Sequence, residues 1–534
     1  MTMKEASGTK RSSIRDFHQA RWNEPIIFEL NQPGEVGIEV VQSGEAEEPG
    51  SSLWEDTALS SILRQDPPAL PELGQMQILK HYLRLSQETL GADFNVDVGQ
   101  GTCTVKYSPK VNEELVRSHK VAGVHPLQEA ETIQGTLTIL HKTDLIFREI
   151  SGMDGFCFQP RSGTHAILAM ASIVRAYHED QGNPERNEVI TTMFSHPSDA
   201  AAAHTLGFKI ISLPQDPSTG LPRIEDLENA LSDRTAALFI TNPEDTGIFN
   251  PDIVNFTELT QNSGGLCCYD QANANGLLGI TRAREAGFDM CFFNLHKTFS
   301  IPHACGGPAS GALGVVDKLV PYFPIPHVVE RDGGFTLEED FPKSIGKIGS
   351  YLGVVPAVIR AYAWIMSLGA EGLRQVSQTA VLNNNYLLHH IRQMKGMDIP
   401  YSKDGFRIEQ VRYSWQKLFE DTGISTEDIV NRMCDHGMHM WSSHHPFIVP
   451  NPMTLEPTES YSIAELDEYI QALESIVEEA YNNPEIVKTA PHKSCIHQVD
   501  HSWLDDPRKW AITWRAYVKK RDSGAYLESS VSIN

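Results

Sequence analysis

The sequence has few cysteines, an excess of acidic over basic residues, and no long apolar run. Eight cysteines occur among 534 residues and none forms a CxxC pair, which argues against a zinc ribbon, a dithiol motif or a disulfide framework. No apolar stretch approaches the roughly 18 residues that span a bilayer. With 44 Lys and Arg against 69 Asp and Glu, the formal charge is −25, and such a chain is poorly suited to nucleic acid or anionic membranes. We expect a cytoplasmic protein that binds neither.

The histidines do not predict a metal site. His444 and His445 are adjacent, and neighbouring side chains in an extended segment point in opposite directions. The overall composition, 40% hydrophobic and 21% charged, is that of a globular protein and excludes wholesale disorder.

Changes in composition along the chain predict three parts. Residues 1–90 include an acidic Gly/Pro stretch and a Pro-rich stretch, so we expect an N-terminal arm that wraps a neighbouring subunit. In residues 91–340, short apolar runs alternate with helical patterns, which predicts a large α/β domain. Residues 341–534 contain long helical patterns, strand-like pieces and an aromatic tail. This last part predicts a smaller α+β domain and a tail.

Continuous apolar runs predict the strands of a mostly parallel, seven-stranded-type sheet flanked by helices. Such runs suit strands that are buried on both faces. The predicted strands are 155–158, 188–192, 208–213, 236–241, 265–269 and 290–293, and helices are predicted at 165–180, 224–232 and 252–263. In the smaller domain, helices are predicted at 356–369, 373–394 and 462–482, and strand-like segments at 406–411 and 445–449.

Two charged residues at the ends of neighbouring predicted strands indicate a cofactor. Asp270 ends one strand, and Lys297 follows the next within a His-Lys-Thr sequence. Ligands in open α/β sheets gather at the carboxyl ends of strands, so we expect both side chains in one crevice. A lysine that forms a Schiff base and a carboxylate that keeps a pyridine nitrogen protonated are what pyridoxal phosphate needs. A solvated loop lysine and a capping aspartate explain this combination less well.

A phosphate-binding turn is predicted upstream of these strands. Ser162, Gly163 and Thr164 lie between a predicted strand and a helix that begins near His165. Backbone N–H groups at a helix start bind phosphate, and Gly163 permits close approach. Many helices start with Ser or Thr, so the turn alone is not specific.

Other residues after predicted strands are candidates for the same site. His196 either stacks on the cofactor ring, where it would take part in catalysis, or caps a helix before Pro197, and the sequence favours neither. Asn242 either borders the ring or only forms a turn. The further cofactor-binding candidates are Ala272, Asn294 and His296. The substrate-side candidates are Arg161, Cys305 and Gly306.

Several motifs resemble the glycine decarboxylase P-protein family, in particular glycine dehydrogenase (decarboxylating) subunit 2. The matching stretches are GTCTVKYSPKVNEE (101–114), HPLQEAETIQG (125–135), TNPEDTGIF (241–249), YDQANANGLLG (269–279), GFDMCFFNLHKTFSIPH (287–303), PKSIGK (342–347), SLGAEGLRQVS (367–377) and EPTES (456–460). The resemblance runs from about residue 22 to about residue 515. It implies a fold-type I pyridoxal-phosphate enzyme with Lys297 as the Schiff-base lysine, Asp270 on the pyridinium and His196 near the ring.

The same resemblance implies a reaction and partners. Glycine would be decarboxylated and its aminomethyl group transferred to the lipoyl group of H-protein, with a subunit 1 paralogue in a heterotetramer, or in a homodimer. The chain departs from the family at residues 196–199 and 304–309 and carries Arg161, which could bind a second carboxylate or a phosphate. A stand-alone pyridoxal-phosphate enzyme for another amino acid, without a lipoyl partner, is therefore the alternative. Retention of Lys297 and Asp270 argues against a third hypothesis, a catalytically dead regulatory partner.

Overall fold

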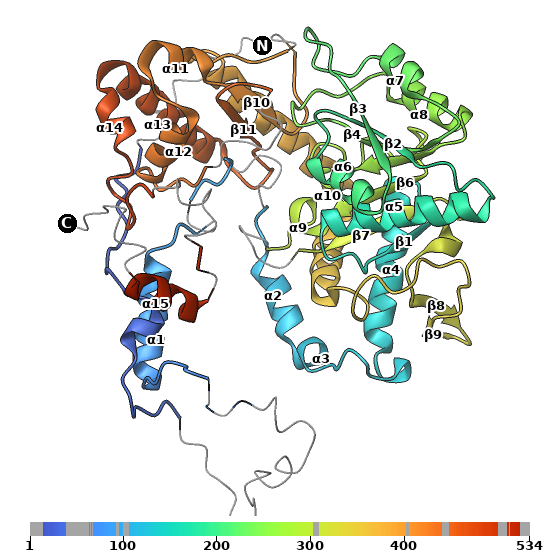
Figure 1. Cartoon of the computed structure of the whole chain (residues 1–534), viewed down its shortest axis with the longest axis horizontal. Helices are drawn as coiled ribbons and strands as arrows, with labels where there is room; N and C mark the ends of the chain where they lie inside the picture. Colours follow the sequence, from blue (N-terminus) through green and yellow to red (C-terminus); the bar gives the residue numbers. More distant parts are fainter. Residues whose placement is uncertain are drawn as a thin grey trace, which may run out of the picture. The chain divides into compact units, whose positions relative to one another are not determined.

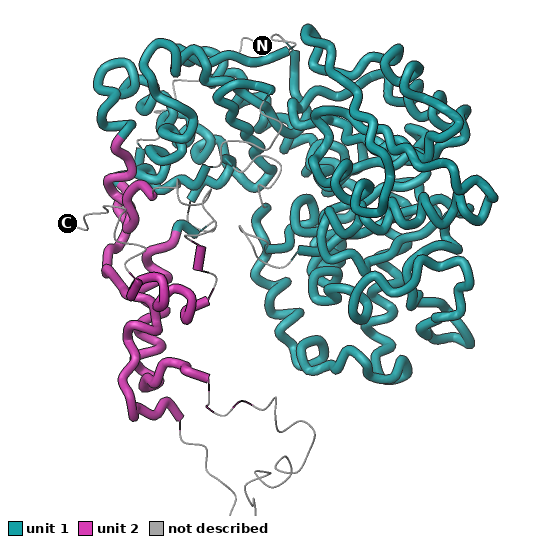
Figure 2. The backbone as a smooth tube through the Cα atoms, in the orientation of Figure 1, with its two compact units in different colours: residues 1–16, 90–488 teal, residues 17–89, 489–534 magenta. Residues whose placement is uncertain are grey.

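The chain forms two compact units in the computed structural model. The structure describes residues 14–38, 64, 66, 68–91, 95–99, 106–302, 309–401, 405–440, 448–499, 510–511 and 513–523. One unit comprises residues 1–16 and 90–488, and the other comprises residues 17–89 and 489–534 (Figure 2). The predicted N-terminal arm therefore falls mainly in the second unit, together with the C-terminal tail.

A seven-stranded, mostly parallel sheet is the centre of the first unit. Its strands are β1 (Gly155–Cys157), β2 (Glu188–Thr192), β3 (Lys209–Leu213), β4 (Thr235–Thr241), β5 (Leu266–Asp270), β6 (Met290–Asn294) and β7 (Gly311–Val315). Their order is β1-β7-β6-β5-β4-β2-β3, and β7 runs antiparallel to both neighbours. The predicted α/β fold class is confirmed. Six of the strands coincide with predicted ones to within one or two residues.

The sequence does not predict the strand β7, because its residues are small and follow a glycine-rich stretch. The structure gives a physical reason for the small residues. The ring of Phe156 lies where a Cβ at Gly314 would stand. In the register of the β1–β7 pair, Phe156 is directly opposite Gly314. The glycine thus makes room for an aromatic side chain of the neighbouring strand.

Helices cover the sheet and supply much of its core (Figure 1). They are α4 (Gln134–Ser151), α5 (Gly163–Asp180), α6 (Pro197–Thr205), α7 (Ile224–Ala230), α8 (Ile253–Asn262) and the short α9 (Leu295–Thr298). The helix α4 buries Leu137, Leu140 and Phe147, which share one helical face. Outside this layer lie α2 (Lys110–Arg117), α3 (His119–Ala122) and the hairpin of β8 (His327–Arg331) and β9 (Gly334–Glu338).

A second buried core follows in the same unit. The long helix α10 (Val355–Ile391) contributes to both cores and is interrupted at Gly369, whose φ is 64°. The second core also includes β10 (Val411–Ser414), β11 (Pro452–Leu455), α11 (Gln416–Thr422), α12 (Thr426–Cys434), α13 (Ile463–Asn482) and α14 (Pro484–Lys488). The α13 helix begins with a capping box between Ser462 and Glu465. The two strands lie a few residues beyond the predicted segments, and residues 445–447 are outside the described part of the chain.

The two cores meet beside the turn that follows β4. The Arg412 guanidinium donates to Asp245 at 2.6 Å in a largely buried ion pair. The Ile408 N–H donates to the Gly247 carbonyl at 3.0 Å. A Cβ at Gly247 would collide with the Gln410 carbonyl oxygen, and its φ of +74° also favours glycine. The second core is therefore seated closely on the carboxyl end of the sheet.

In its described residues, the second unit consists of two helices, α1 (Gln75–Gln87) and α15 (Trp514–Asp522), and a 3-10 turn, Ile27–Leu30. Glu24 accepts from Arg84 at 3.1 Å and lies 2.9 Å from the buried His81 ring. The rings of Phe28 and Trp514 stack with centroids 4.9 Å apart. Among all the helices that the structure describes, none is both long enough and apolar enough to cross a membrane.

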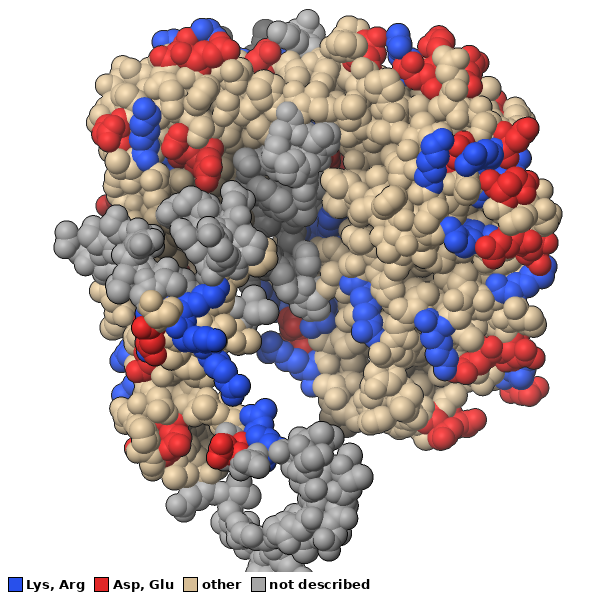
Figure 3. Space-filling model, viewed as in Figure 1, with Lys and Arg blue, Asp and Glu red and all other residues tan. Residues whose placement is uncertain are grey.

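Charged side chains of both signs are mixed over the face of the first unit that Figure 3 shows. Many of them pair on the surface, as Arg223 does with Asp226 at 2.9 Å. Such exposed pairs stabilise the fold by at most about 1 kcal/mol each. Other charged side chains are buried at the strand ends, among them Asp270 and Lys297.

Candidate active site

The carboxyl ends of the central parallel strands bring the predicted lysine and aspartate into one region. β4, β5 and β6 are hydrogen-bonded neighbours, with Thr241 opposite Asp270 and Asp270 opposite Phe292. Lys297 lies in α9, which follows β6 directly. The positive charge of Lys297 acts on Asp270 and favours its ionised form.

Lys297 is a buried amine with no polar partner among the residues that the structure describes. The residue is 7% exposed, and within the described chain its Nζ has no hydrogen bond or ion pair. Burying an unpaired ammonium costs free energy. Next to it, His296 places Nδ1 3.1 Å from both the N and the O of Ser310, which holds α9 against the start of β7. The site thus presents an amine that a carbonyl group can engage.

Asp270 is a buried carboxyl whose charge needs a partner. It is 4% exposed, and its Oδ1 accepts from the Ala272 N–H at 2.8 Å. Burial raises the pKa of Asp270 to about 6, although the Ala272 hydrogen bond and Lys297 both oppose this rise. A protonated ring nitrogen would compensate the remaining negative charge. Asp270 and Lys297 therefore fit the two ends of pyridoxal phosphate.

The predicted phosphate turn forms the N-terminus of an 18-residue helix. Ser162 is the N-cap of α5, and its Oγ accepts from the His165 N–H at 3.1 Å. Gly163 and Thr164 are the first helical residues, so their N–H groups have no partner within the helix. A Cβ at Gly163 would lie 2.9 Å from Asn294 Nδ2 and 3.0 Å from Asn294 Oδ1. The Oδ1 atom is buried and has no hydrogen-bond partner among described residues. Gly163 thus lets the Asn294 side chain pack against the N-terminus of α5, where backbone N–H groups could bind a phosphate.

A Gly163→Ala substitution is expected to weaken cofactor binding. The added methyl must displace Asn294, and overpacking of this kind costs about 1–3 kcal/mol, or roughly tenfold to a hundredfold in affinity. Fluorescence titration of the apoenzyme with pyridoxal phosphate measures the change. Gly135→Ala in α4 is the matched control, because a Cβ there meets nothing within 4 Å. Equal affinities of the two variants would contradict the close approach at Gly163.

Two predicted cofactor residues have structural roles in the turns that hold them. His196 is the N-cap of α6, where its Nδ1 accepts from the Ser198 N–H at 3.2 Å. The Asn242 amide accepts from the Asn250 N–H at 2.8 Å and donates to the Asn250 carbonyl at 3.3 Å. Both residues follow strands of the same sheet edge. Contact of either side chain with a cofactor remains a prediction.

The turn after β4 also contains a buried glutamate with a high pKa. Glu244 is 1% exposed, the Thr192 hydroxyl donates to its Oε1, and its Oε2 has no partner among the described residues. Burial raises the pKa of Glu244 to about 8 from an ordinary value of 4.5. The folded protein therefore holds this proton more tightly than the unfolded chain does.

The free energy of unfolding is expected to fall as the pH rises from about 5 to about 8, because Glu244 ionises at a lower pH in the unfolded chain than in the folded protein. The contribution of Glu244 to the fall between pH 5 and pH 8 is about 2–4 kcal/mol. Glu244→Gln should remove it, which urea unfolding at the two pH values measures. The exposed Glu228→Gln is the control. Identical pH dependence in wild type and Glu244→Gln would show that Glu244 is ionised in the fold.

The positive charge of Lys297 also acts on two buried glutamates that come with the second core, Glu409 and Glu456. Glu456 accepts from the side-chain amides of Asn273 and Asn275, the latter at 2.6 Å. Glu409 accepts from the Gly276 N–H at 3.1 Å. Burial raises the pKa of Glu456 to about 7, and burial together with Glu456 raises the pKa of Glu409 well above its usual range. The positive charge of Lys297 opposes both shifts.

A second buried lysine, Lys106, lies close to these glutamates. Lys106 lies 2.8 Å from Glu459, and its side chain is 0% exposed. Its charge also favours ionisation of Glu409 and Glu456. The sequence does not mark Lys106, Glu409 or Glu456 as site residues. Lys106 and Glu456 fall within two of the family-like stretches, residues 101–114 and 456–460, whereas Glu409 lies outside all of them.

The substrate-side candidates are only partly described. Arg161 is exposed, and its Nη2 donates to the Ser350 carbonyl at 2.8 Å. Its backbone N–H donates to His165 Nδ1 at 3.2 Å. Cys305 and Gly306, like the histidines at 444 and 445, lie outside the described residues.

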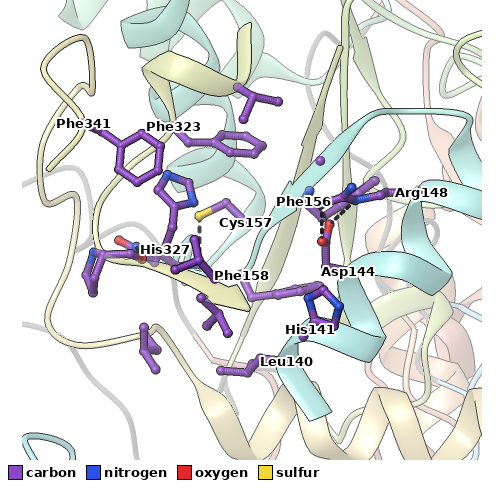
Figure 4. Close-up of a pocket in the computed structure, with 17 residues that line it drawn as sticks. Leu140, His141, Asp144, Arg148, Phe156, Cys157, Phe158, Phe323, His327 and Phe341 are labelled. Atoms are coloured by element: carbon purple, nitrogen blue, oxygen red, sulfur yellow. Dashed lines mark hydrogen bonds and ion pairs between the residues drawn. The ribbon is translucent and has the colours of Figure 1, made fainter. Parts of the chain in front are cut away.

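A separate cavity of about 180 Å³ lies away from these residues. Phe156, Phe158, Phe323 and Phe341 line it, with His327 and the Asp144–Arg148 ion pair at its wall (Figure 4). Burial lowers the pKa of His327 to about 4, so this histidine is neutral at pH 7. None of the predicted cofactor residues lines this cavity.

Comparison with known proteins decides the family. Residues 160–302 match the model of aminotransferase class-V, and residues 376–501 match that of glycine dehydrogenase, C-terminal domain. The probable glycine dehydrogenase (decarboxylating) subunit 2 of Pyrococcus furiosus is 41% identical over 510 residues, covering 95% of this chain and 99% of the relative. This chain belongs to the glycine dehydrogenase (decarboxylating) subunit 2 family. A relative of the same name from Thermotoga petrophila is 38% identical, covering 92% and 99% of the two chains.

A solved structure shows the shared fold. Glycine decarboxylase (P-protein) of the glycine cleavage system, in inhibitor-bound form, matches with a TM-score of 0.65 at 20% identity, over 78% of this chain and 93% of the other. The predicted family, the fold and the predicted dependence on pyridoxal phosphate are confirmed for this glycine dehydrogenase subunit 2 family member. The subunit 2 name of the relatives implies a subunit 1 beside them.

Proposed function

We propose that this chain decarboxylates glycine and passes the remaining aminomethyl group to the lipoyl group of an H-protein. The observation that carries the proposal is the buried Lys297 amine, which has no partner within the described part of the chain and lies at a strand end next to that of Asp270. Support also comes from the 41% identity to a probable glycine dehydrogenase (decarboxylating) subunit 2 over 95% of the chain. Within the described residues, nothing favours the alternative of a stand-alone enzyme for another amino acid.

The residues that would hold pyridoxal phosphate come from three strand ends. Lys297 would bind its aldehyde carbon, Asp270 would face its pyridine nitrogen, and the α5 N-terminus at Ser162, Gly163 and Thr164 would bind its phosphate. When bound, the cofactor supplies an electron sink for the electron pair left at the substrate Cα.

The chain itself orients the substrate and controls protons. The Cα–carboxylate bond of glycine must stand perpendicular to the ring before it breaks, so the site has to hold the carboxylate in that position. Lys297 accepts and returns a proton at Nζ, and Asp270 keeps its negative charge at the far end of the ring. In the transfer, a C–S bond forms as the lipoyl S–S bond breaks, and the second sulfur takes a proton.

The partners follow from the same proposal. We infer that a subunit 1 paralogue completes the enzyme as a heterotetramer and that lipoylated H-protein is the acceptor. The support is the name of the relatives, subunit 2. This chain matches 99% of the length of the relatives from Pyrococcus furiosus and Thermotoga petrophila.

An exchange assay tests the proposed function. Purified full chain is incubated with its subunit 1 paralogue, glycine and labelled bicarbonate, with and without lipoylated H-protein. The proposal predicts label in the glycine carboxyl group, with strong stimulation by H-protein. A protein that binds pyridoxal phosphate but gives no exchange under any of these conditions would contradict it.

A further inference from the structure

We propose that Asp199 is a positioning residue that donates a carboxyl proton to Asp270 and so fixes the carboxylate that faces the pyridine nitrogen. The inference rests on the role of Asp270 in the proposed function. Apart from the departure from the family at residues 196–199, no feature of the sequence marks this side chain for chemistry.

The geometry places two carboxyl groups in one buried contact. Asp199 lies in the first turn of α6, just beyond the carboxyl end of β2, and is 1% exposed. Its side chain is within hydrogen-bonding reach of Asp270, which is 4% exposed at the end of β5. Among the described residues, no N–H or O–H group donates to Asp199 Oδ2, and no cation pairs with the side chain. Two carboxyl groups can share a hydrogen bond only if one of them carries a proton.

The surroundings decide which carboxyl carries that proton. Asp270 receives the Ala272 N–H at 2.8 Å and the field of Lys297, and both favour its ionised form. Asp199 has neither. Burial and the charge of Asp270 raise the pKa of Asp199 well above its usual range. The N-terminus of α6 favours a carboxylate, but burial beside Asp270 outweighs it.

Other charged groups around the pair are consistent with one proton and one negative charge. Asp245 faces Asp270 and raises its pKa, and the Arg412 guanidinium neutralises Asp245 at 2.6 Å. The Cys268 thiol faces Asp199 from β5 and stays protonated, because burial raises its pKa. The pair therefore holds a single charge, and it sits on Asp270.

This arrangement fixes the orientation of Asp270. The Ala272 N–H holds one side of its carboxylate, and the Asp199 hydroxyl adds a second donor from α6. The carboxylate then cannot turn freely, and its remaining lone pairs are aimed at one place. A ring N–H bound there meets an acceptor that needs no reorganisation.

Two substitutions separate this role from simple packing. Asp199→Asn keeps a neutral donor of the same shape but cannot titrate, and Asp199→Ala removes the donor. The apoenzyme of the Asp199→Asn variant is expected to bind pyridoxal phosphate with an affinity within about threefold of that of the wild type, since one neutral donor replaces another. Apoenzyme with Ala is expected to bind roughly tenfold more weakly, because a hydrogen bond to a charged group is lost.

Infrared difference spectra provide the second readout, and they need neither cofactor nor activity. Wild type minus Asp199→Asn at pH 7 is expected to show the loss of one carboxylic-acid C=O band. The exposed Asp233→Asn control is expected to show the loss of a carboxylate band instead. A carboxylate band lost in Asp199→Asn, or wild-type affinity in Asp199→Ala, would overturn the proposal. Because neither readout uses glycine or H-protein, the outcome is independent of the exchange assay.

Discussion

The Lys297→Ala variant is expected to lose the absorbance band of the lysine-linked cofactor and at least about a thousandfold of its exchange activity. The methyl group of alanine can neither bind the cofactor aldehyde nor exchange a proton at the position of Nζ. Among the described residues, the amine that is removed has no polar partner, so the substitution leaves no described group unpaired. The variant should therefore fold, which thermal unfolding checks alongside the absorbance spectrum.

Lys347→Ala is the matched control for this experiment. Lys347 is an exposed lysine whose Nζ lies 2.8 Å from Glu339 on the surface. Its loss should change neither the spectrum nor the activity. A cofactor band retained in Lys297→Ala would show that another amine binds the aldehyde.

Replacement of Asp270 should separate cofactor binding from cofactor reactivity. Asp270→Asn keeps an oxygen that accepts the Ala272 N–H but removes the negative charge. Without that charge the ring nitrogen loses its proton more easily and withdraws electrons less strongly. We expect part of the cofactor to stay bound while exchange activity falls by about a hundredfold or more.

Asp270→Ala separates the loss of the charge at this position from the loss of the hydrogen-bond acceptor. It removes both the charge and the acceptor for Ala272, so it should bind less cofactor than Asp270→Asn at a similarly low activity. Cofactor content is read from absorbance and activity from the labelled exchange. If Asp270→Asn retained activity within about threefold of wild type, the reaction would not depend on a carboxylate at this place.

The central strands could be predicted because strands that are buried on both faces appear in the sequence as continuous apolar runs. β2 occupies the predicted residues 188–192, and β6 extends its predicted run by Asn294 alone. β7 could not be predicted, because it consists largely of small residues, one of which, Gly314, makes room for the Phe156 ring on a strand far away in sequence. β10 and β11 pair with each other within the second core, so their register depends on long-range packing rather than on the local apolar pattern.

Some residues of the candidate site could likewise be predicted from the sequence, and others could not. Lys297, Asp270 and the Ser162–Thr164 turn follow strands directly, so the topology rule for open sheets places them without knowledge of the fold. Asp199, Glu409 and Glu456 look like ordinary surface acids in the sequence, and only long-range packing buries them. Asp199 is buried because α6 follows β2 onto the sheet. Glu409 is buried because the second core closes over the turns after β4 and β5.

Reduction of the cofactor-loaded enzyme with borohydride, followed by peptide mapping, tests the central claim most directly. Borohydride converts the lysine-linked cofactor into a stable adduct on whichever side chain carries it. The account predicts one pyridoxyl-phosphate adduct per chain, on Lys297 in the peptide that contains residues 287–303. An adduct on any other lysine, or an unmodified Lys297 in fully loaded enzyme, would contradict it.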